Sequence, residues 1–470
     1  MRVTVLGAGY VGVTSAAVLA HLGHQVNCIE SDPRRLERWR RGEDPLEEPG
    51  LAELLRDLRL RFVESPRELS LADVVLVAVG TPMGHDGAPD LSQLEAAADE
   101  IRRFARERAI VLMRSTVPVG TCDRLQNASL ADQYVVSNPE FLREGHALED
   151  AFHPSRIIAG GPEEARGVVE ELYRPIIRSR MGRKGNGHPA GTPFLWMSAR
   201  SAELAKYAAN GFLATKLSFV NEIANLAQSV DADASAVLES MGFDPRIGAQ
   251  HLRPGLGWGG SCFPKDTRAL QAIADGVGYD FVVLRAAIEQ NTRQLCRFAE
   301  AIEKDVPRAS TVALLGLAFK AGTPDTRESP ALALVRRLTH GGLHVSAYDP
   351  AVRALPADLG VLVRATAIEA CAGADAIVVA TEWPEFAEMD LVALRRAARG
   401  DLLFDGREVI SPAKATAAGF RYYGISGLRR DPESRPAQAS HPLRSRLDGA
   451  LAHGTLVGLR PNREPARSGP

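Results

Sequence analysis

The sequence predicts an α/β protein in which two doubly wound parallel sheets are joined by a long central helix. Three observations support this prediction. Strand, glycine-rich turn and helix follow one another from residue 2, a stretch of 30 residues near the middle lacks proline, and strand patterning returns after residue 310. Alternating strands and helices are typical of parallel sheets covered on both faces. The 470 residues suffice for two or three domains of about 150 residues each.

The first sheet is expected in a domain over residues 1–196. Arg2–Leu6 is apolar and β-branched, and the glycine-rich turn Gly7–Gly12 follows it. Val13–Leu22 is patterned as a helix, and Val26–Ile29 is patterned as a second strand. Further strands are expected at Asp73–Val79, Ile110–Met113 and Tyr134–Val136. This order predicts a Rossmann-like sheet.

The central helix is expected in a domain over residues 197–300. Ser201–Val230 contains no proline and one glycine, and its apolar residues recur at helical spacing on more than one face. Such a helix is about 45 Å long, which exceeds the surface of one small domain. We therefore expect it to be shared between domains or between subunits. The preceding segment Arg180–Pro193 is rich in glycine and proline and is expected to form a loop outside the active site.

The second sheet is expected over residues 301–430. Thr311–Leu315 resembles the first strand of the chain, and Ala374–Thr381 repeats the pattern of a later one. The turn Gly316–Lys320 lacks the three glycines of the first domain, so we expect it to bind something other than a dinucleotide pyrophosphate. Residues 431–470 are rich in proline, arginine and serine and are expected to be a disordered tail.

Composition excludes several classes of function. A net charge of −2 gives no general attraction to nucleic acid or anionic membranes. The five cysteines are too few and too scattered for a disulfide framework or a zinc site, so we expect no metal and a reducing, cytoplasmic location. The longest apolar runs fall far short of the ~18 residues of a membrane span. A strand begins at Val3, so no signal peptide is expected.

The first glycine-rich turn predicts a dinucleotide site. Gly7 permits the tight turn, Gly9 lets the backbone approach a pyrophosphate, and Gly12 allows close helix–strand packing. Glu30 follows Gly12 by 18 residues, at the end of the next strand. Its carboxylate would bind the adenosine ribose and repel a 2′-phosphate, which favours NAD over NADP. Neighbouring arginines, Arg35 among them, weaken that preference slightly.

Cys262 is the candidate nucleophile. It lies in Gly259–Asp266, where glycines give access to the backbone and Pro264 suits the first turn of a helix. A helix N-terminus and nearby Lys265 would both lower the pKa of the thiol and make a thiolate more available. Alternatively, Cys262 is a small residue of the hydrophobic core with no catalytic role.

Other polar residues could complete a catalytic site. Lys206 and Asn210 share one face of the central helix and could stabilise an oxyanion, although a lysine on a solvent-exposed face fits the pattern equally well. Glu140 and Glu144 follow a strand, where either carboxylate could be a general base. Thr116 also follows a strand, but a threonine there is equally explained by a turn in which its hydroxyl bonds the local backbone.

Together these residues predict a four-electron oxidation. Hydride transfer from an alcohol gives an aldehyde, which a thiolate can trap as a thiohemiacetal. A second hydride transfer gives a thioester, and water then releases an acid. A two-electron hydroxyacid dehydrogenase would share the first sheet and the long helix without needing Cys262, and a catalytically inactive protein that only binds the substrate would need neither Cys262 nor Lys206.

The chain resembles the UDP-glucose/GDP-mannose dehydrogenase family over about residues 1–425. The resemblance rests on ordered segments: Gly7–Gly12, Glu48–Leu51, Val79–Pro82, Ser115–Gly120, Asn138–Gly145, Ser201–Asn210, Gly259–Asp266, Gly316–Lys320 and Phe404–Arg407. It implies NAD as cofactor and oxidation of a nucleotide sugar, and it implies that the long helix builds a homodimer.

The resemblance also implies residue roles. The catalytic residues would be Cys262, Lys206, Asn210, Asp266, Glu140 and Thr116. The cofactor-binding residues would be Gly7, Gly9, Tyr10, Val11, Gly12, Glu30, Arg35, Thr81, Thr116, Glu144, Lys265 and Arg327. The substrate-binding residues would be Glu140, Phe141, Leu142, Arg143, Lys206, Asn210, Arg246, Gly255, Gly259, Phe319, Lys320 and Arg407, with Arg246 reaching the neighbouring subunit's substrate.

UDP-glucose is the expected substrate, because Phe243–Gly248 resembles the segment of that branch of the family. GDP-mannose and UDP-N-acetylhexosamines remain alternatives. Two features depart from the family pattern. Arg180–Pro193 is longer than usual, and Trp258 stands where tyrosine or phenylalanine is commoner, beside the sugar-binding glycines, which leaves the fine substrate preference open.

Overall fold

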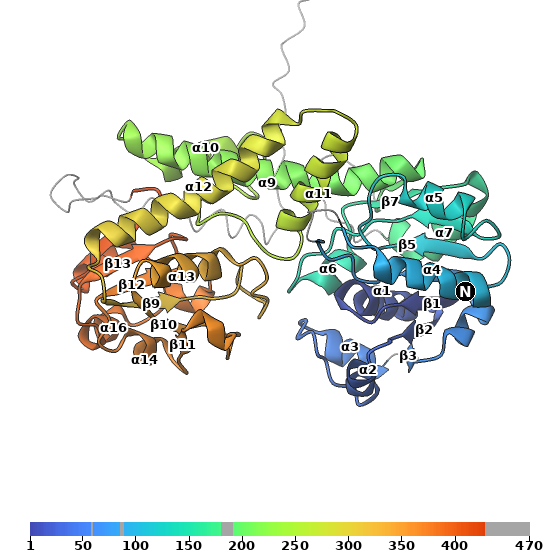
Figure 1. Cartoon of the computed structure of the whole chain (residues 1–470), viewed down its shortest axis with the longest axis horizontal. Helices are drawn as coiled ribbons and strands as arrows, with labels where there is room; N and C mark the ends of the chain where they lie inside the picture. The colour runs from blue at the N-terminus through green and yellow to red at the C-terminus, as the bar shows by residue number, and fades with distance from the viewer. Residues whose placement is uncertain (58–59, 85–88, 180–190, 428–470) are drawn as a thin grey trace, which may run out of the picture.

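The computed structural model describes residues 1–57, 60–84, 89–179 and 191–427. Two α/β lobes lie side by side, and long helices run along one edge of both (Figure 1). The expected fold class is confirmed: two Rossmann-like sheets are joined by a helical segment. The expected tail at 431–470, and residues 180–190 of the expected loop, lie outside the described residues.

The first sheet has eight strands in the described part of the chain, in the order β3-β2-β1-β4-β5-β6-β7-β8. They are β1 (Arg2–Leu6), β2 (Gln25–Ile29), β3 (Leu60–Val63), β4 (Val74–Val77), β5 (Ile110–Met113), β6 (Tyr134–Ser137), β7 (Ile157–Gly160) and β8 (Phe194–Met197). Strand order reverses between β1 and β4, and in such sheets the crevice at the carboxyl ends of these strands is the usual ligand site.

The sequence predicts a parallel sheet, but one pair of strands in the structure is antiparallel. β6 and β7 pair antiparallel, and only through Ser137 opposite Gly160. The physical reason is the connection between the two strands, which contains only the six-residue helix α6 (Ala147–Phe152) and does not return the chain to the amino ends of the strands.

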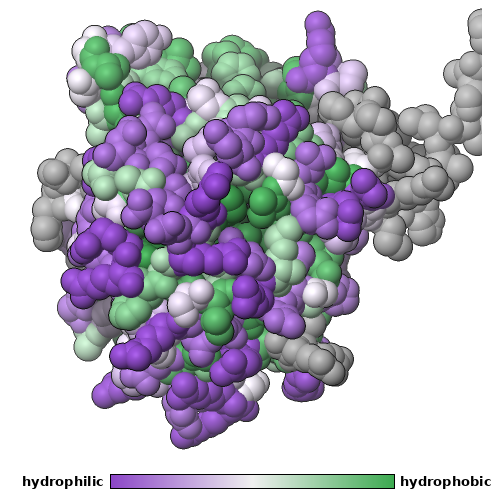
Figure 2. Space-filling view, turned by 90° about the vertical axis from the view of Figure 1, so that its right-hand side faces the viewer, coloured by the Kyte–Doolittle hydropathy of each residue, from purple (hydrophilic) through white to green (hydrophobic). Residues whose placement is uncertain are grey.

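Helices cover both faces of this sheet. They are α1 (Tyr10–His21), α2 (Pro33–Arg40), α3 (Leu51–Asp57), the 3-10 turn η1 (Pro66–Leu71), α4 (Ser92–Phe104), α5 (Thr121–Asn127), α6, α7 (Glu163–Leu172) and α8 (Arg174–Ile177). Figure 2 shows the end of the molecule that this lobe forms, where hydrophilic side chains predominate and apolar ones occur in small groups.

The central segment is helical. It comprises α9 (Ala199–Ser229), α10 (Ala234–Gly242), α11 (Phe263–Gly276) and α12 (Val282–Asp305). The Ser198 hydroxyl caps α9 by accepting the Ser201 N–H, and α11 and α12 pack against α9. The expected domain limits at 196 and 300 fall inside β8 and α12, because neither element meets a proline or glycine there.

The second sheet has the order β11-β10-β9-β12-β13-β14 among the described residues. Its strands are β9 (Thr311–Leu315), β10 (His344–Tyr348), β11 (Leu362–Val363), β12 (Ala376–Val379), β13 (Leu402–Asp405) and β14 (Arg421–Gly424). Its helical elements are α13 (Pro330–His340), η2 (Ala357–Leu359), α14 (Ala367–Cys371), α15 (Pro384–Ala387), α16 (Leu391–Ala397) and α17 (Pro412–Ala417). All of its strand pairs are parallel.

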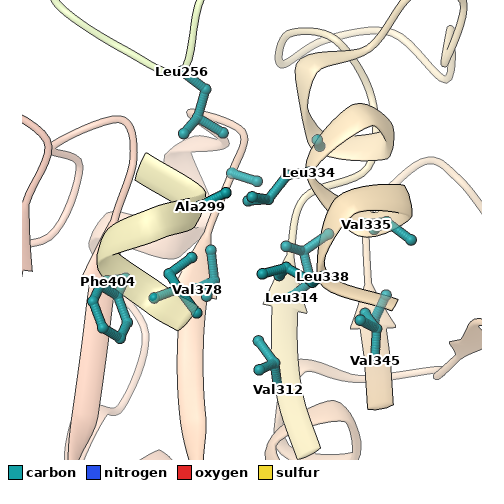
Figure 3. Packing of buried hydrophobic residues seen from close by; sticks show 14 of the residues in the cluster. Leu256, Ala299, Val312, Leu314, Leu334, Val335, Leu338, Val345, Val378 and Phe404 are labelled. Atoms are coloured by element: carbon teal, nitrogen blue, oxygen red, sulfur yellow. The ribbon is translucent and has the colours of Figure 1, made fainter. Parts of the chain in front are cut away.

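The core of the second lobe extends into the central segment. Leu256, which precedes α11, and Ala299 of α12 lie in one buried cluster with Leu314, Leu338 and Phe404 (Figure 3). This shared packing attaches α12 and the loop before α11 to the second sheet. Within the described ranges, no helix is both long and apolar enough to cross a membrane.

Candidate active site

Two hollows meet at Cys262. A groove of about 1150 Å³ lies at the carboxyl ends of β1 and β4, and a cavity of about 450 Å³ lies between the loop after β6, α9 and the second lobe. Cys262 lines both of them, as do Glu140 and Glu144. A thiol at this junction can reach a ligand in either hollow.

The groove is built around the first glycine-rich turn. Gly7 has φ +95°, and a Cβ there would lie 2.7 Å from the Ala78 carbonyl oxygen. A Cβ on Gly12 would lie 1.8 Å from the Gly7 carbonyl oxygen, so Gly12 is required by packing rather than by the ligand. A Cβ on Gly9 would meet no protein atom within 4 Å, and Gly9 lines the groove. The backbone there is open to a pyrophosphate, so the turn fits a dinucleotide.

Glu30 is buried at the far end of the groove. One of its carboxylate oxygens accepts the Asp32 N–H at 2.8 Å, and the other lies 3.2 Å from the Arg35 guanidinium. Because this ion pair already engages Arg35, the arginine is not free for a 2′-phosphate. The geometry therefore favours NAD.

All the residues expected to bind the cofactor, except Gly12, line the groove. Besides the glycines of the turn, they are Tyr10, Val11, Glu30, Arg35, Thr81, Thr116, Glu144, Lys265 and Arg327. Thr81 Oγ1 donates to the backbone carbonyl of Thr116 at 2.9 Å, which joins the loops after β4 and β5.

Cys262 is the N-cap residue of α11, as the sequence predicted, but the expected effect on its thiol is wrong. Burial raises the pKa of Cys262, and the Lys206 ammonium only partly opposes this. Lys265 is instead paired with the Asp266 carboxylate. The cation that favours the thiolate thus comes from α9 rather than from the neighbouring sequence.

Lys206 is buried rather than exposed on a solvent face. Its ammonium donates to Oε1 of Glu140 at 2.9 Å and to the backbone carbonyl of Glu140 at 2.6 Å. Burial opposes the charge on both groups, but their attraction outweighs it, so the pKa of Lys206 is raised and that of Glu140 is lowered. The pair is therefore ionised.

Asn210 and Asp266 form a second polar pair beside Lys206. Nδ2 of Asn210 donates to Asp266 at 2.5 Å, and both residues are buried. Asn210 lines the cavity and Asp266 lines the groove. This arrangement places amide, carboxylate and ammonium groups around the thiol.

Glu144 joins the first lobe to the second. Oε1 accepts the Ser261 hydroxyl at 2.9 Å and the Arg327 guanidinium at 3.1 Å. Burial, followed by the Asp325 carboxylate, raises the pKa of Glu144 to about 7. Its backbone carbonyl accepts the Lys320 ammonium at 2.7 Å. Glu144 can therefore change its protonation near neutral pH.

The expected substrate-binding residues only partly line the cavity. Those that line it are Glu140, Phe141, Leu142, Arg143, Lys206, Asn210, Gly259, Phe319 and Lys320. Arg407 and Gly255 contact one another instead: a Cβ on Gly255 would lie 3.0 Å from the Arg407 guanidinium. Arg246 pairs with Asp244 and has a side chain 87% exposed, away from the cavity of its own chain.

Trp258 lies in helix packing rather than among the residues that line the cavity. Its indole N–H donates to the Ser218 hydroxyl at 3.0 Å, and the residue is 7% exposed. The tryptophan at this position, where the family more often has tyrosine or phenylalanine, therefore affects packing against α9.

Two arginines at the site were missed from the sequence. Arg114 lines both hollows, and its Nε has no partner among the described residues. Its place directly after β5 was a signal, because ligand contacts gather at carboxyl ends of strands. Arg156 stacks on the Phe141 ring, with the guanidinium carbon 3.8 Å from the ring centroid. No local sequence pattern predicts Arg156 as a site residue, because its contact with Phe141 depends on β7 folding back beside β6.

The turn of the second sheet differs from the first turn in one decisive way. The Asp349 carboxylate accepts the N–H groups of Leu317 at 2.7 Å and Ala318 at 3.0 Å. These are the groups that would otherwise face a phosphate. This occupation agrees with the expectation that the second turn does not bind a dinucleotide pyrophosphate.

Comparison with known proteins identifies the family. The sequence matches the NAD binding domain of the UDP-glucose/GDP-mannose dehydrogenase family over residues 1–177, its central domain over 200–293 and its UDP binding domain over 313–412. The chain belongs to the UDP-glucose/GDP-mannose dehydrogenase family. The resemblance seen in the sequence is thereby confirmed, and with it NAD as cofactor and a nucleotide-sugar dehydrogenase activity.

Individual members of the family are similar over nearly their whole length. A UDP-glucose 6-dehydrogenase of Pseudomonas aeruginosa is 43% identical over 460 residues, covering 91% of this chain and 98% of the relative. The structure of a UDP-glucose dehydrogenase from Pyrobaculum islandicum is 37% identical with a TM-score of 0.81, covering 91% and 98% of the two chains. A UDP-D-ManNAc dehydrogenase from Pyrococcus horikoshii is 29% identical with a TM-score of 0.79, covering 91% and 99%.

Proposed function

We propose that the protein oxidises the C6 hydroxymethyl group of UDP-glucose to the carboxylate of UDP-glucuronate and reduces two NAD per turnover. The position of Cys262 at the junction of the cofactor groove and the substrate cavity carries this proposal. A thiol there can hold the sugar while the cofactor is exchanged. Similarity to UDP-glucose 6-dehydrogenases at 43% and 40% identity supports the choice of sugar.

The first oxidation converts the alcohol to an aldehyde. When bound, NAD supplies the acceptor for one hydride in each oxidation. As the C6 hydroxyl loses its proton, the Lys206 ammonium and the Asn210 amide stabilise the negative charge on its oxygen. Both groups lie on one face of α9 and line the cavity.

The covalent stage uses Cys262. Its thiolate attacks the aldehyde carbon and forms a C–S bond, and the carbonyl oxygen gains a proton to give a thiohemiacetal. Loss of a second hydride and of the hydroxyl proton gives a thioester. Water, which Asp266 and Thr116 would orient and Glu140 would deprotonate, then adds to the carbonyl, and the C–S bond breaks to release the acid and the thiol.

The remaining binding roles are part of the same proposal. Tyr10, Val11, Thr81, Lys265 and Arg327 would hold the cofactor beside the glycine turn. Phe319, Lys320 and Arg407 of the second lobe would close on the nucleotide sugar. These roles correspond to three parts of the chain: a cofactor-binding part that ends with β8, a central helical part that ends with α12, and a nucleotide-sugar-binding part that follows α12.

We also propose a homodimer in the cytoplasm. Large apolar side chains stand exposed along α9 at intervals of seven or eight residues, at Leu204, Phe212, Phe219 and Leu226, and Val230 directly after the helix is exposed as well. Such spacing makes a continuous stripe that a second helix would cover. All five cysteines lie in the described ranges as free thiols, which suits a reducing compartment.

A panel of UDP- and GDP-sugars tests the function. We expect two NADH for each UDP-glucose consumed and UDP-glucuronate as product. One NADH per sugar with release of free aldehyde would refute the thioester mechanism. Faster turnover of GDP-mannose or of a UDP-N-acetylhexosamine would leave the mechanism intact and reassign the substrate.

A further inference from the structure

Glu48 is a buried carboxylate to which the reaction above assigns no role. It lies in the segment Glu48–Leu51, just before α3, and is 4% exposed. Oε1 accepts the Ala147 N–H at 2.6 Å, and Oε2 accepts the Gly145 N–H at 2.8 Å. No basic side chain of the described ranges forms an ion pair with it. Backbone N–H groups therefore replace a cation.

The third partner of Glu48 is Tyr10, from the cofactor turn. The Tyr10 hydroxyl lies 2.6 Å from Oε2 of Glu48 and 3.0 Å from the carbonyl oxygen of Arg143. Burial and the Glu48 carboxylate raise the pKa of Tyr10, so the phenol remains a hydrogen-bond donor. Tyr10 is also the first residue of α1 and lines the cofactor groove.

These contacts converge on the segment that carries Glu144. Glu48 and Tyr10 hold its backbone from the first lobe, at Arg143, Gly145 and Ala147. On the opposite side, Lys320 donates to the Glu144 carbonyl, and the Glu144 side chain accepts from Ser261, next to Cys262. The cofactor turn is thus linked to the segment lining the substrate cavity through two side chains.

We propose that Glu48 is a positioning residue that, through Tyr10, couples binding in the cofactor groove to binding in the sugar-nucleotide cavity. This inference rests on the proposed function. Two cofactor molecules must bind in succession while the sugar remains attached to Cys262, so the segment around Glu144 must keep its place during the exchange. The Glu48–Tyr10 link holds it from the cofactor side.

Coupling is measured by titrating NAD into the protein with and without saturating UDP-glucuronate, a pair that cannot react. For the wild type we expect the Kd of NAD to change at least about fivefold on addition of UDP-glucuronate. In Tyr10→Phe and in Glu48→Gln the factor falls below about twofold. Glu48→Gln also lowers kcat, counted per binding site, at least about tenfold, a barrier increase of about 1.4 kcal/mol.

Asp73→Asn is the matched control. Asp73 also accepts a backbone N–H, from Arg2 at 2.8 Å, but it precedes β4 at the amino ends of the strands, away from the site. This variant keeps the wild-type coupling factor and kcat.

Three results would overturn the inference: a wild-type coupling factor of one, an unchanged factor in Tyr10→Phe, or wild-type kcat per site in Glu48→Gln. Tyr10→Phe leaves both backbone bonds of Glu48 intact, so it decides the matter even where Glu48→Gln fails to fold. Failure of the wild type to oxidise UDP-glucose would instead refute the proposed function.

Discussion

Lys206 and Glu140 form a buried ion pair that joins α9 to the loop after β6. The ammonium lies 2.9 Å from the carboxylate, and the two side chains are 5% and 9% exposed. Sixty-six residues separate them in the chain. The pair places a cation and a potential base side by side in the wall of the cavity, and it makes each residue dependent on the other.

Lys206→Met should affect both activity and stability. Loss of the oxyanion partner is expected to lower kcat by about 10²–10³-fold. The Glu140 carboxylate is left buried without a cation, which costs about 3–5 kcal/mol of unfolding free energy. The double variant Lys206→Met with Glu140→Gln should recover most of the stability and none of the activity. Denaturant unfolding and steady-state kinetics measure the two effects, and recovery of activity in the double variant would contradict the assigned role.

Cys262→Ala should abolish acid formation. Without the thiol no thioester forms, and we expect UDP-glucuronate production to fall by more than about 10³-fold. Chromatography of the nucleotide sugars, combined with NADH absorbance, follows the product. Cys296→Ala, on α12 and outside both hollows, is the control and keeps full activity. Full activity of Cys262→Ala would require another nucleophile.

Glu30→Ala should relax the choice of cofactor. The change removes the carboxylate that repels a 2′-phosphate and frees Arg35 to bind one. We expect the ratio of kcat/KM for NADP to that for NAD to rise at least about tenfold, or about 1.4 kcal/mol. Glu37→Ala, which breaks a surface pair with Arg41 on α2, leaves the ratio unchanged. An unchanged ratio in Glu30→Ala would show that discrimination lies elsewhere in the groove.

Glu144 should make stability depend on pH in a defined window. Its pKa is raised from 4.5 to about 7 by burial and by Asp325, so the folded state binds the proton more tightly than the unfolded state. The stabilising contribution is therefore complete below about pH 4.5 and is lost as pH rises to about 7, by up to about 3 kcal/mol. Unfolding free energies of wild type and Glu144→Gln, compared from pH 4.5 to 8, measure it. Parallel curves would contradict the assignment.

Charge on the α9 stripe should separate subunits. Phe212 and Phe219 are 69% and 51% exposed. The double substitution to glutamate is expected to weaken dimerisation at least about 100-fold, or about 2.7 kcal/mol. Light scattering over a range of concentrations measures the mass. Leu362→Glu, on strand β11 and 60% exposed, is the control and remains dimeric. A wild type that is monomeric throughout would refute the dimer.

Local chemistry in the sequence was sufficient to predict several parts of the site. Gly7, Gly9 and Gly12 predict their turn because the constraints on a glycine act within a few residues and a neighbouring strand. Cys262 at the start of α11 followed in the same way from flanking glycines and Pro264. The parallel sheets followed from alternating apolar strands and helices. In the first sheet the four-residue strands β3, β7 and β8 and the reversal at β7 were missed, since such short strands and the six-residue helix α6 leave no clear pattern in the sequence.

Tertiary structure alone decided the electrostatics of the site. In the sequence Lys206 was compatible with a solvent face, and Lys265 was the cation nearest Cys262. The fold instead buries Lys206 beside Glu140, pairs Lys265 with Asp266, and lets burial raise the pKa of the thiol. Sequence patterns report contacts between near neighbours along the chain. Burial, and the pairing of Lys206 with Glu140, depend on residues tens to hundreds of positions apart, which only packing of the two lobes around α9 brings together.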